Sequence, residues 1–559
     1  MRLRPKILPA LIGALLAAMA AASHAAGPIQ GVAKEWSFDH FTAGGTVPTG
    51  TGRSSEIVAF DAVNKNLWVV GGNGIDVLNL AGSLLKSFET TSVYGGVNSV
   101  SIRNGIAAVA FNNLTARDGL GSVQFFDTTT ILSATTVGAA NLGGVAVGNV
   151  PDMVTWTQDG TKVLVANEGE RYFASGTTFN PAGSVSVIDF NHAAPATSTV
   201  TTVGFSAFDG QESALRSAGV RIQSGVSASI ALEPEYIALS ADGTTAHVTL
   251  QEANAIGILD LRTRSFSNIV PLGTKDFGLP ANTIDPSDRP TQTPPVINFV
   301  NVPVKGLYMP DGIAAYSAGG STYYVMANEG DAFTDDSDIA RVGSLTLDAA
   351  AFGGAANVTS LQNNNNLGRL NVSTIGSNGE NGVGANASGL TELVAIGGRS
   401  FSIRDANGVL VFDSGDQLDK QAHALGLYAD GRSDDKGVEP EGVALHTIAG
   451  RTLAFIGLER TTRSTVAVFD ITDPKNATFL QMIVGDLASE LRPEGILAFE
   501  SDGKIYLAVA NEAVDDIPSL NGSNRTVLYE ITPVPEPSTY ALMAAGLLGL
   551  GWAARRRRG

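Results

Sequence analysis

Short runs of mostly apolar and β-branched residues recur along the chain, and tight turns separate these runs. In one stretch, Met153–Thr157 and Lys162–Ala166 flank a turn that contains Asp159 and Gly160, and Ser184–Phe190 follows. Such runs of about four to eight residues bounded by turn signals are typical of β-strands, and an Asp-Gly pair between two runs is typical of a hairpin turn. The pattern predicts short strands joined by turns rather than helices.

This strand–turn–strand phrase recurs about seven times. Each copy opens with an acidic or amide residue before an apolar run, and an Asn or Glu follows about 17 positions later. The copies open at Glu56, Asn98, Asp152, Glu235, Asp311, Glu441 and Glu494. Regular repetition of units with three or four strands indicates a β-propeller. We therefore predict an all-β fold, a β-propeller with seven blades, while six or eight blades stay open.

Several segments depart from this repeat pattern. Lys34–Phe41 alternates but has no repeat of its own, so we expect it to complete the last blade beside Thr526–Thr532 and remove an exposed edge. Residues 263–307 are rich in Pro and Thr, and residues 345–390 in Asn and Gly. Both are too long for ordinary connections, which predicts functional loops or poorly ordered excursions. Leu393–Asp416 either completes the fifth blade or begins another.

Charge and residue usage exclude several classes of function. The formal net charge is −18, which argues against a nucleic-acid or anionic-membrane partner for the folded part. Cysteine is absent, so disulfides, thiolate metal sites and cysteine nucleophiles are excluded. The six histidines form no His-x-x-x-His pair, and no Gly-x-Ser-x-Gly motif is present. A zinc hydrolase and an α/β-hydrolase nucleophile are therefore not expected.

The N-terminus has the layout of a secretory signal peptide, which we assign to residues 1–25. Arg2, Arg4 and Lys6 precede the apolar run Ile7–Ala22, and small residues follow at the expected cleavage site. A buried helix is the alternative, but the placement of the charges disfavours it. The signal peptide predicts that the protein is exported, with residues 26–532 forming the propeller.

The C-terminal segment 533–559 contains a short proline motif, the apolar run Thr539–Ala554 and a basic cluster, in that order. The apolar run predicts a membrane anchor helix, and the arginines would keep its end on the cytoplasmic side. The segment resembles the PEP-CTERM sorting signal of Gram-negative bacteria. The resemblance implies an exosortase-type protease as partner, followed by release or attachment at the envelope, surface or extracellular matrix. The residues that carry it are Pro535, Glu536, Pro537, Arg555, Arg556, Arg557 and Arg558.

The repeated acidic residues predict a metal site. In a propeller blade the first strand begins and the second strand ends on the same face, so the acidic residues at these points should gather at one rim. Few basic residues accompany them, and crowded carboxylates need a compensating cation. Calcium prefers such oxygen ligands. The candidate ligands are Asp152, Glu168, Glu235, Asp311, Glu329, Asp331, Glu441 and Glu494. The alternative is structural, since such residues also clip neighbouring blades by bonding to backbone amides.

Two loops break the symmetry of the repeats. Glu329–Asp338 holds four aspartates within eight positions, and Asn167–Arg171 combines two glutamates with an arginine. The first loop lacks the fixed glycine and terminal glutamate of an EF-hand. A solvated acidic loop is an equal alternative to a metal site there.

Four separated phrases, Ala166–Glu170, Ala327–Asp331, Gly397–Ile403 and Val438–Gly442, resemble the choice-of-anchor I family. The resemblance implies a bacterial surface protein built on a YVTN/WD40-like propeller. We expect its ligand among envelope or extracellular polymers. Some members carry an alkaline-phosphatase-like label, which implies a second hypothesis, a calcium-dependent phosphoesterase. Its candidate catalytic residues are Glu168, Glu329, Glu441, Arg460 and Arg492. A purely adhesive matrix protein is a third hypothesis.

Overall fold

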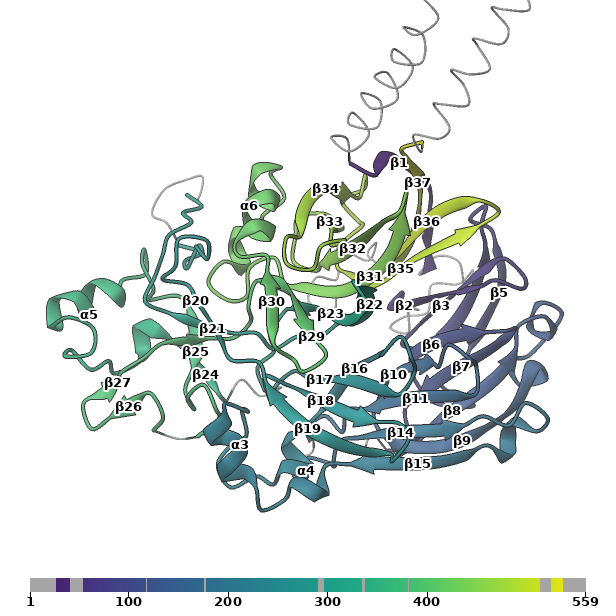
Figure 1. The fold of residues 1–559 in the computed structure, drawn as a ribbon, viewed down its shortest axis with the longest axis horizontal. Helices are drawn as coiled ribbons and strands as arrows, with labels where there is room; N and C mark the ends of the chain where they lie inside the picture. Colours follow the sequence, from purple (N-terminus) through teal and green to yellow (C-terminus); the bar gives the residue numbers. More distant parts are fainter. Residues whose placement is uncertain are drawn as a thin grey trace, which may run out of the picture.

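The structure is a computed structural model, and it describes residues 27–40, 54–116, 118–174, 177–289, 296–333, 337–380, 382–512 and 524–535. Seven four-stranded antiparallel sheets make up most of it (Figure 1). The predicted signal peptide, and the predicted sorting segment from Glu536 onward, lie outside the described residues. In the described ranges, no helix combines the length and apolar character needed to cross a membrane.

The first four sheets follow one another along the chain. The first sheet contains β2 (Ile57–Asp61), β3 (Asn66–Gly71), β4 (Gly74–Asn79) and β5 (Leu84–Glu89). The second contains β6 (Val97–Arg103), β7 (Ile106–Phe111), β8 (Leu120–Asp127) and β9 (Asn141–Asn149). The third contains β10 (Pro151–Trp156), β11 (Lys162–Asn167), β14 (Ser184–Asp189) and β15 (Thr199–Gly204). The fourth contains β16 (Pro234–Leu239), β17 (Thr245–Leu250), β18 (Ala255–Asp260) and β19 (Ser265–Pro271).

The last three sheets complete the ring. The fifth contains β22 (Ile313–Ala318), β23 (Ser321–Asn328), β29 (Ser400–Asp405) and β30 (Leu410–Asp413). The sixth contains β31 (Pro440–Ile448), β32 (Arg451–Leu458), β33 (Thr465–Asp470) and β34 (Thr478–Val484). The seventh contains β35 (Pro493–Ser501), β36 (Lys504–Asn511), β37 (Arg525–Pro533) and β1 (Ile29–Asp39). The first strand of each sheet contacts the first strand of the next, and β35 contacts β2, which closes the ring. The prediction of an all-β propeller is confirmed.

The N-terminal strand closes the seventh sheet as predicted. β1 is its outer strand and pairs antiparallel with β37, with Lys34 opposite Tyr529 and Ser37 opposite Val527. The last sheet is therefore built from both ends of the described chain, which leaves β37 with a partner on each side. The segment Leu393–Asp416 completes the fifth sheet through β29 and β30, which settles the alternative left open by the sequence.

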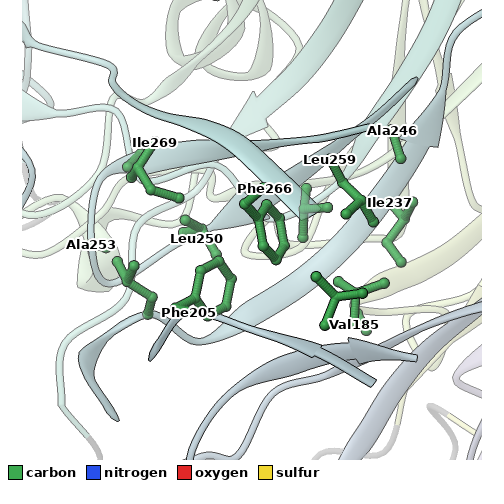
Figure 2. Close-up of a cluster of buried hydrophobic side chains, with 14 of the residues drawn as sticks. Val185, Phe205, Ile237, Ala246, Leu250, Ala253, Leu259, Phe266 and Ile269 are labelled. Atoms are coloured by element: carbon green, nitrogen blue, oxygen red, sulfur yellow. The ribbon is translucent and has the colours of Figure 1, made fainter. Parts of the chain in front are cut away.

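An apolar layer lies between each pair of neighbouring sheets. Between the third and fourth sheets, Val185 on β14 faces Ile237 on β16, and the rings of Phe205 and Phe266 stack with their centroids 4.3 Å apart (Figure 2). The strands are apolar on both faces because each sheet is covered on both sides by its neighbours. This burial is the main stabilising contribution in a chain without disulfides.

The two predicted insertions are not separate excursions. Residues 265–271 belong to β19, and the other described residues of both insertions form one side unit beside the fifth sheet (Figure 1). In it β20 (Thr274–Asp276), β21 (Lys305–Leu307) and β28 (Val394–Ala395) share a small sheet, and α5 (Ala355–Leu361) packs nearby. Phe277 from the first insertion and Leu367 from the second lie in the same buried cluster. The sequence did not reveal this unit because its apolar residues are too irregularly spaced to show a period.

Candidate functional site

The acidic residues that open the repeats lie at equivalent places at the start of the first strands. Five of them follow a proline, namely Asp152, Glu235, Asp311, Glu441 and Glu494. The ladder between the first and second strands shifts register by a bulge at four of these five positions. Proline has no N–H group to continue the ladder, and a bulge re-aims the side chain beside it. The repeated Pro-acid pair is therefore the local reason why these carboxylates leave the sheets.

Small glycines let the first strands approach closely at this end. A Cβ atom on Gly442 would lie 2.3 Å from the carbonyl oxygen of Glu494, and one on Gly495 would lie 2.4 Å from that of Glu56. Gly312 has the same relation to Glu441. Because each glycine follows its acidic residue directly, the close approach brings neighbouring carboxylates of the ring together.

The structure brings all eight candidate metal ligands to the lining of one cavity of about 340 Å³. These residues are Asp152, Glu168, Glu235, Asp311, Glu329, Asp331, Glu441 and Glu494. A second cavity of about 700 Å³ adjoins it and is lined by Glu56, Glu512 and several shared residues. We call the lining of these two cavities the acidic mouth.

Burial and mutual repulsion oppose ionisation in the acidic mouth. Burial, followed by the nearby Glu329 carboxylate, holds the pKa of Asp311 well above its usual range. Burial and the neighbouring Glu494 do the same for the pKa of Glu441. Burial raises the pKa of Glu252 to about 8, with Asp331 adding to the effect. A bound cation would replace protons as the compensating charge.

Two groups of three carboxylates in or directly beside the mouth lie close enough together to hold a metal ion. One group is Asp311, Glu329 and Glu441, and the other is Glu329, Glu439 and Glu459. In each group one oxygen per residue lies within 4.8 Å of the others. Glu329 belongs to both groups, so the two potential cation positions are adjacent. Carboxylate-only donor sets suit hard cations such as Ca²⁺.

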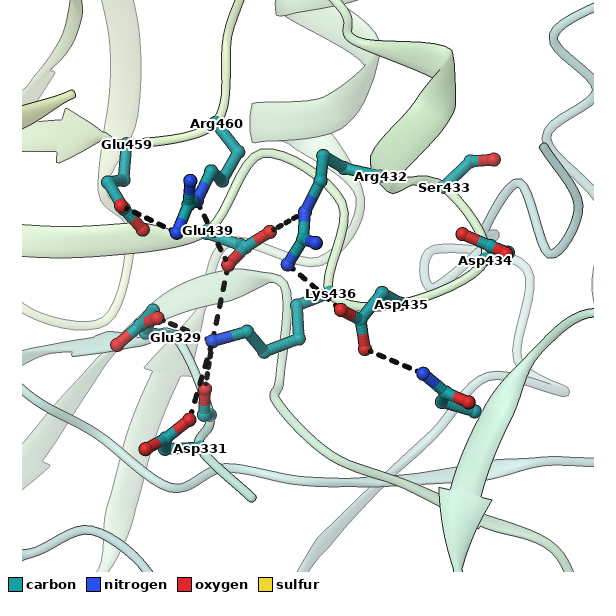
Figure 3. Close-up of polar contacts among 12 residues, drawn as sticks. Glu329, Asp331, Arg432, Ser433, Asp434, Asp435, Lys436, Glu439, Glu459 and Arg460 are labelled. Carbon is teal, nitrogen blue, oxygen red and sulfur yellow. Dashed lines mark hydrogen bonds and ion pairs between the residues drawn. The ribbon is translucent and has the colours of Figure 1, made fainter. Parts of the chain in front are cut away.

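The two groups differ in their basic neighbours. Glu439 is fully buried and pairs with Lys436 at 3.2 Å and with Arg432 at 2.7 Å (Figure 3). Burial alone would raise the pKa of Glu439, but Lys436 and Arg432 outweigh it and lower that pKa. In the described part of the chain, no Lys, Arg or His side chain forms an ion pair with Asp311 or Glu441.

Sequence reasoning missed Lys436, Glu439 and Arg432. The available signal was local: within residues 434–441, Lys436 is the only basic residue and stands among four acidic ones.

The predicted catalytic arginines both lie beside Glu459. Arg460 Nη2 is 3.0 Å from Glu459 Oε1, and Arg492 Nε is 3.9 Å from the same oxygen. Arg460 lines the smaller cavity.

The described residues of the acidic loop Glu329–Asp338 lie in two different surroundings. Glu329 faces the acidic mouth, whereas Asp338 is buried away from it, pairs with Arg221 and accepts a hydrogen bond from the Phe333 N–H at 3.0 Å. Asp335 and Asp336 lie outside the described residues. The loop is thus divided between the mouth and a structural ion pair.

Residues 56–474 match the choice-of-anchor I domain, which is most of the chain. The chain belongs to the choice-of-anchor I domain family. Residues 533–558 match the PEP-CTERM protein-sorting motif. Both resemblances seen in the sequence are therefore confirmed. Together they indicate an exported, surface-associated protein whose tail is recognised by exosortase-type processing machinery.

Solved structures are similar to this choice-of-anchor I protein over most of its length, at low identity. Hydrazine synthase of Kuenenia stuttgartiensis is 10% identical, with 87% of this chain and 97% of that chain covered and a TM-score of 0.44. A streptogramin B lyase is 9% identical, with 91% and 100% covered and a TM-score of 0.43. The β-propeller domain of Cps50 (Swd1) from Myceliophteria thermophila is 8% identical, with 86% and 97% covered and a TM-score of 0.41. At these values the similarity says nothing about activity. A search of curated proteins found no match.

In this choice-of-anchor I domain, the amide of the Asn-Glu phrase and the glutamate after it have different roles. Asn167 is buried, accepts a hydrogen bond from the Gly148 N–H at 3.0 Å and donates one to Ser186 Oγ at 3.0 Å. Asn328 donates to Ser400 Oγ at 3.1 Å and accepts from Ser402 Oγ at 3.1 Å, both on β29 of its own sheet. The amides are thus bonded to residues of the sheets, and the glutamates that follow them line the acidic mouth.

The phrases that carry the family resemblance meet at this mouth. Three of the four include residues that line the smaller cavity. The fourth, Gly397–Ile403, contributes the buried Arg399, whose Nη2 donates to the carbonyl oxygens of Ser433 at 2.7 Å and Asp435 at 2.8 Å. Arg399 therefore holds the loop that carries Lys436.

Proposed function

We propose that this exported, surface-associated protein is a binding propeller that takes up Ca²⁺ at the acidic mouth. The observation that supports the proposal is the group Asp311, Glu329 and Glu441. Its three carboxylate oxygens lie within 4.8 Å of one another, and among the described residues neither Asp311 nor Glu441 has a basic partner. A divalent cation would offset their repulsion and desolvation.

Glu329 is held in place for such a role. Gln251 Nε2 donates a hydrogen bond to Glu329 Oε2 at 3.0 Å, and Lys436 Nζ donates to Oε1 at 2.6 Å. The backbone around Asp311 is also constrained, since Met309 has a φ of 43° two residues before it. Constrained backbone of this kind persists where the surrounding structure over-determines it, often at ligand sites.

Isothermal titration of the purified protein with Ca²⁺ and Mg²⁺ tests the proposal. We expect Ca²⁺ to bind more tightly than Mg²⁺, because buried carboxylates without octahedral geometry favour the larger ion. Glu441→Gln should weaken Ca²⁺ binding by at least about tenfold, while Glu89→Gln, a change of an exposed glutamate, should leave it unchanged. Equal Ca²⁺ binding by both variants would overturn the proposal.

The phosphoesterase hypothesis stays a prediction, and one assay separates it from binding. Arg460 and Arg492 are both close to Glu459, so they are compensated by a carboxylate rather than presented to a phosphoryl group. Hydrolysis of a phosphomonoester is measured with added Ca²⁺ and after chelation. Turnover that requires Ca²⁺ would make the mouth an active site, and no turnover in either condition would leave the binding propeller.

We further propose that the propeller presents the bound ion at the envelope of a Gram-negative cell. The sorting motif supports export to such an envelope, and the acidic chain would bind an anionic matrix polymer only through a bridging cation. Pull-down of the protein with anionic extracellular polysaccharide should therefore require Ca²⁺. Retention that is unchanged by a chelator would contradict this extension.

A further inference from the structure

We propose that the ammonium group of Lys436 acts as a built-in cation between the carboxylates of the second group. The acidic mouth then has a single position for an exchangeable divalent cation. This inference rests on the proposed function, since it states how many ions the mouth takes and where. The occupied group is Glu329, Glu439 and Glu459, and the exchangeable one is Asp311, Glu329 and Glu441.

The contacts of Lys436 are those of a cation inside a cage of oxygens. Its Nζ lies 2.6 Å from Glu329 Oε1, 2.6 Å from the Gly330 carbonyl oxygen and 3.2 Å from Glu439 Oε2. Asp331 is a more distant neighbour at 3.9 Å. Figure 3 shows the lysine side chain reaching between Glu329 and Glu439. Only 12% of the Lys436 side chain is exposed, so the ammonium depends on these oxygens rather than on water.

The fold positions this lysine from several sides. Arg399 Nη2 donates to the Ser433 and Asp435 carbonyl oxygens just before Lys436. The Val438 N–H donates to Asp419 Oδ1 at 3.2 Å just after it. A freely moving surface lysine has no such supports, so the ammonium is part of the site rather than a chance neighbour.

The charge balance assigns the metal to the other group. Glu439 has Lys436 and Arg432 as close partners, and Glu459 has Arg460 at 3.0 Å. A divalent ion added there would meet three positive charges already in place. In the other group only Glu329 has an ion-pair partner, Lys436, and neither Asp311 nor Glu441 forms an ion pair among the described residues.

A second observation points to a missing ligand in the same cavity. Glu252 lines it and is more than nine-tenths buried, yet its Oε2 atom has no hydrogen-bond partner among the described residues. A buried acceptor without a donor is costly unless an ion or water satisfies it. Two adjacent cations that share one carboxylate are the arrangement of two-metal sites, and here the lysine takes the place of one ion.

The test is the number of Ca²⁺ ions bound per chain, measured by isothermal titration and by equilibrium dialysis of the purified protein. We expect one ion for the wild type, one for Lys436→Arg, which keeps the charge, and two for Lys436→Met. Two ions in the wild type, or one in Lys436→Met, would overturn the inference. No ion in the wild type would overturn the proposed function itself, so the two failures are distinguishable.

Lys436→Met removes a buried charge, and thermal melting with and without Ca²⁺ shows whether it folds. A variant that folds only with Ca²⁺ and then holds two ions supports the inference. A second pair of variants does not depend on its folding. Glu441→Gln should weaken Ca²⁺ binding by at least about tenfold, because it removes a ligand charge. Glu459→Gln should leave the single ion bound. Loss of that ion would show that the group of Glu329, Glu439 and Glu459 binds the metal, and this would overturn the inference.

Discussion

Gln251 donates a hydrogen bond from Nε2 to Glu329 Oε2 at 3.0 Å, across the boundary between the fourth and fifth sheets. The two residues follow β17 and β23, the second strands of their sheets, so the bond joins equivalent points of neighbouring repeats. It orients Glu329, whereas Asp311 and Glu441, which lie close to it, form no ion pair with a basic side chain among the described residues. The acidic mouth therefore combines carboxylates that stabilise the fold with carboxylates that oppose it.

Replacing Asp311 and replacing Glu329 should change stability in opposite directions. Without Ca²⁺, Asp311→Asn should raise the free energy of unfolding by about 2 kcal/mol, since it removes a buried carboxyl group that has no ion-pair partner among the described residues and must take up a proton on folding. Glu329→Gln should lower it by about 3 kcal/mol, because Lys436 loses its closest carboxylate. Urea unfolding in the presence of a chelator measures both, and changes of the same sign would show that the mouth is not divided in this way.

The glycines behind the mouth should tolerate no side chain. Gly442→Ala places a Cβ 2.3 Å from the Glu494 carbonyl oxygen, so the strands must separate at a cost of about 1–3 kcal/mol. Gly31→Ala on β1 is the matched control, because a Cβ there meets nothing within 4 Å. Thermal melting compares the two, and a control as destabilised as Gly442→Ala would refute the packing argument.

His40 should secure the closure of the ring. Its Nδ1 lies 2.8 Å from Asp76 Oδ2 on β4, and its Nε2 lies 2.8 Å from Thr526 Oγ1 on β37, so it joins the first and seventh sheets. His40→Ala leaves the buried Asp76 carboxylate without this partner and should cost about 3 kcal/mol. The exposed His192 provides the comparison, and His192→Ala should stay within about 0.5 kcal/mol of the wild type. Denaturant midpoints that shift equally for both would argue against a closing role.

His247 should make the protein less stable in acid. Burial lowers its pKa to about 4, below the value of about 6.5 expected in the unfolded chain, and its ring stacks on Tyr324. The unfolded state therefore binds the proton more strongly. The stabilising contribution of the neutral ring is complete above about pH 6.5 and declines by about 1.4 kcal/mol per unit as the pH falls toward 4.

The mouth carboxylates titrate over the same range, so the measurement compares wild type with His247→Phe. The free energy of unfolding of the wild type minus that of His247→Phe should decrease as the pH falls from 7 to 5. A difference independent of pH would mean that His247 is not held neutral by burial.

The propeller was predictable because its signals are local. The apolar run in Lys162–Ala166, the Asp159 and Gly160 turn, and the return of the same pattern in each repeat depend only on nearby residues. The convergence of the acidic residues also followed, because strand direction determines which end of a sheet they occupy. The side unit around Phe277 and Leu367 was not predictable, since its core joins residues about 90 positions apart without a period.

The sequence by itself determined the sorting of the protein, its family and its repeated sheets, because sorting motifs, family motifs and hydrophobic patterns each lie within short stretches of consecutive residues. Only the tertiary structure decided which carboxylates share a cation and which are already neutralised. Lys436 and Glu329 are more than 100 positions apart, and their charges meet only because the fifth and sixth sheets pack side by side. Electrostatic energy depends on distance and burial, and neither is fixed until the sheets have packed.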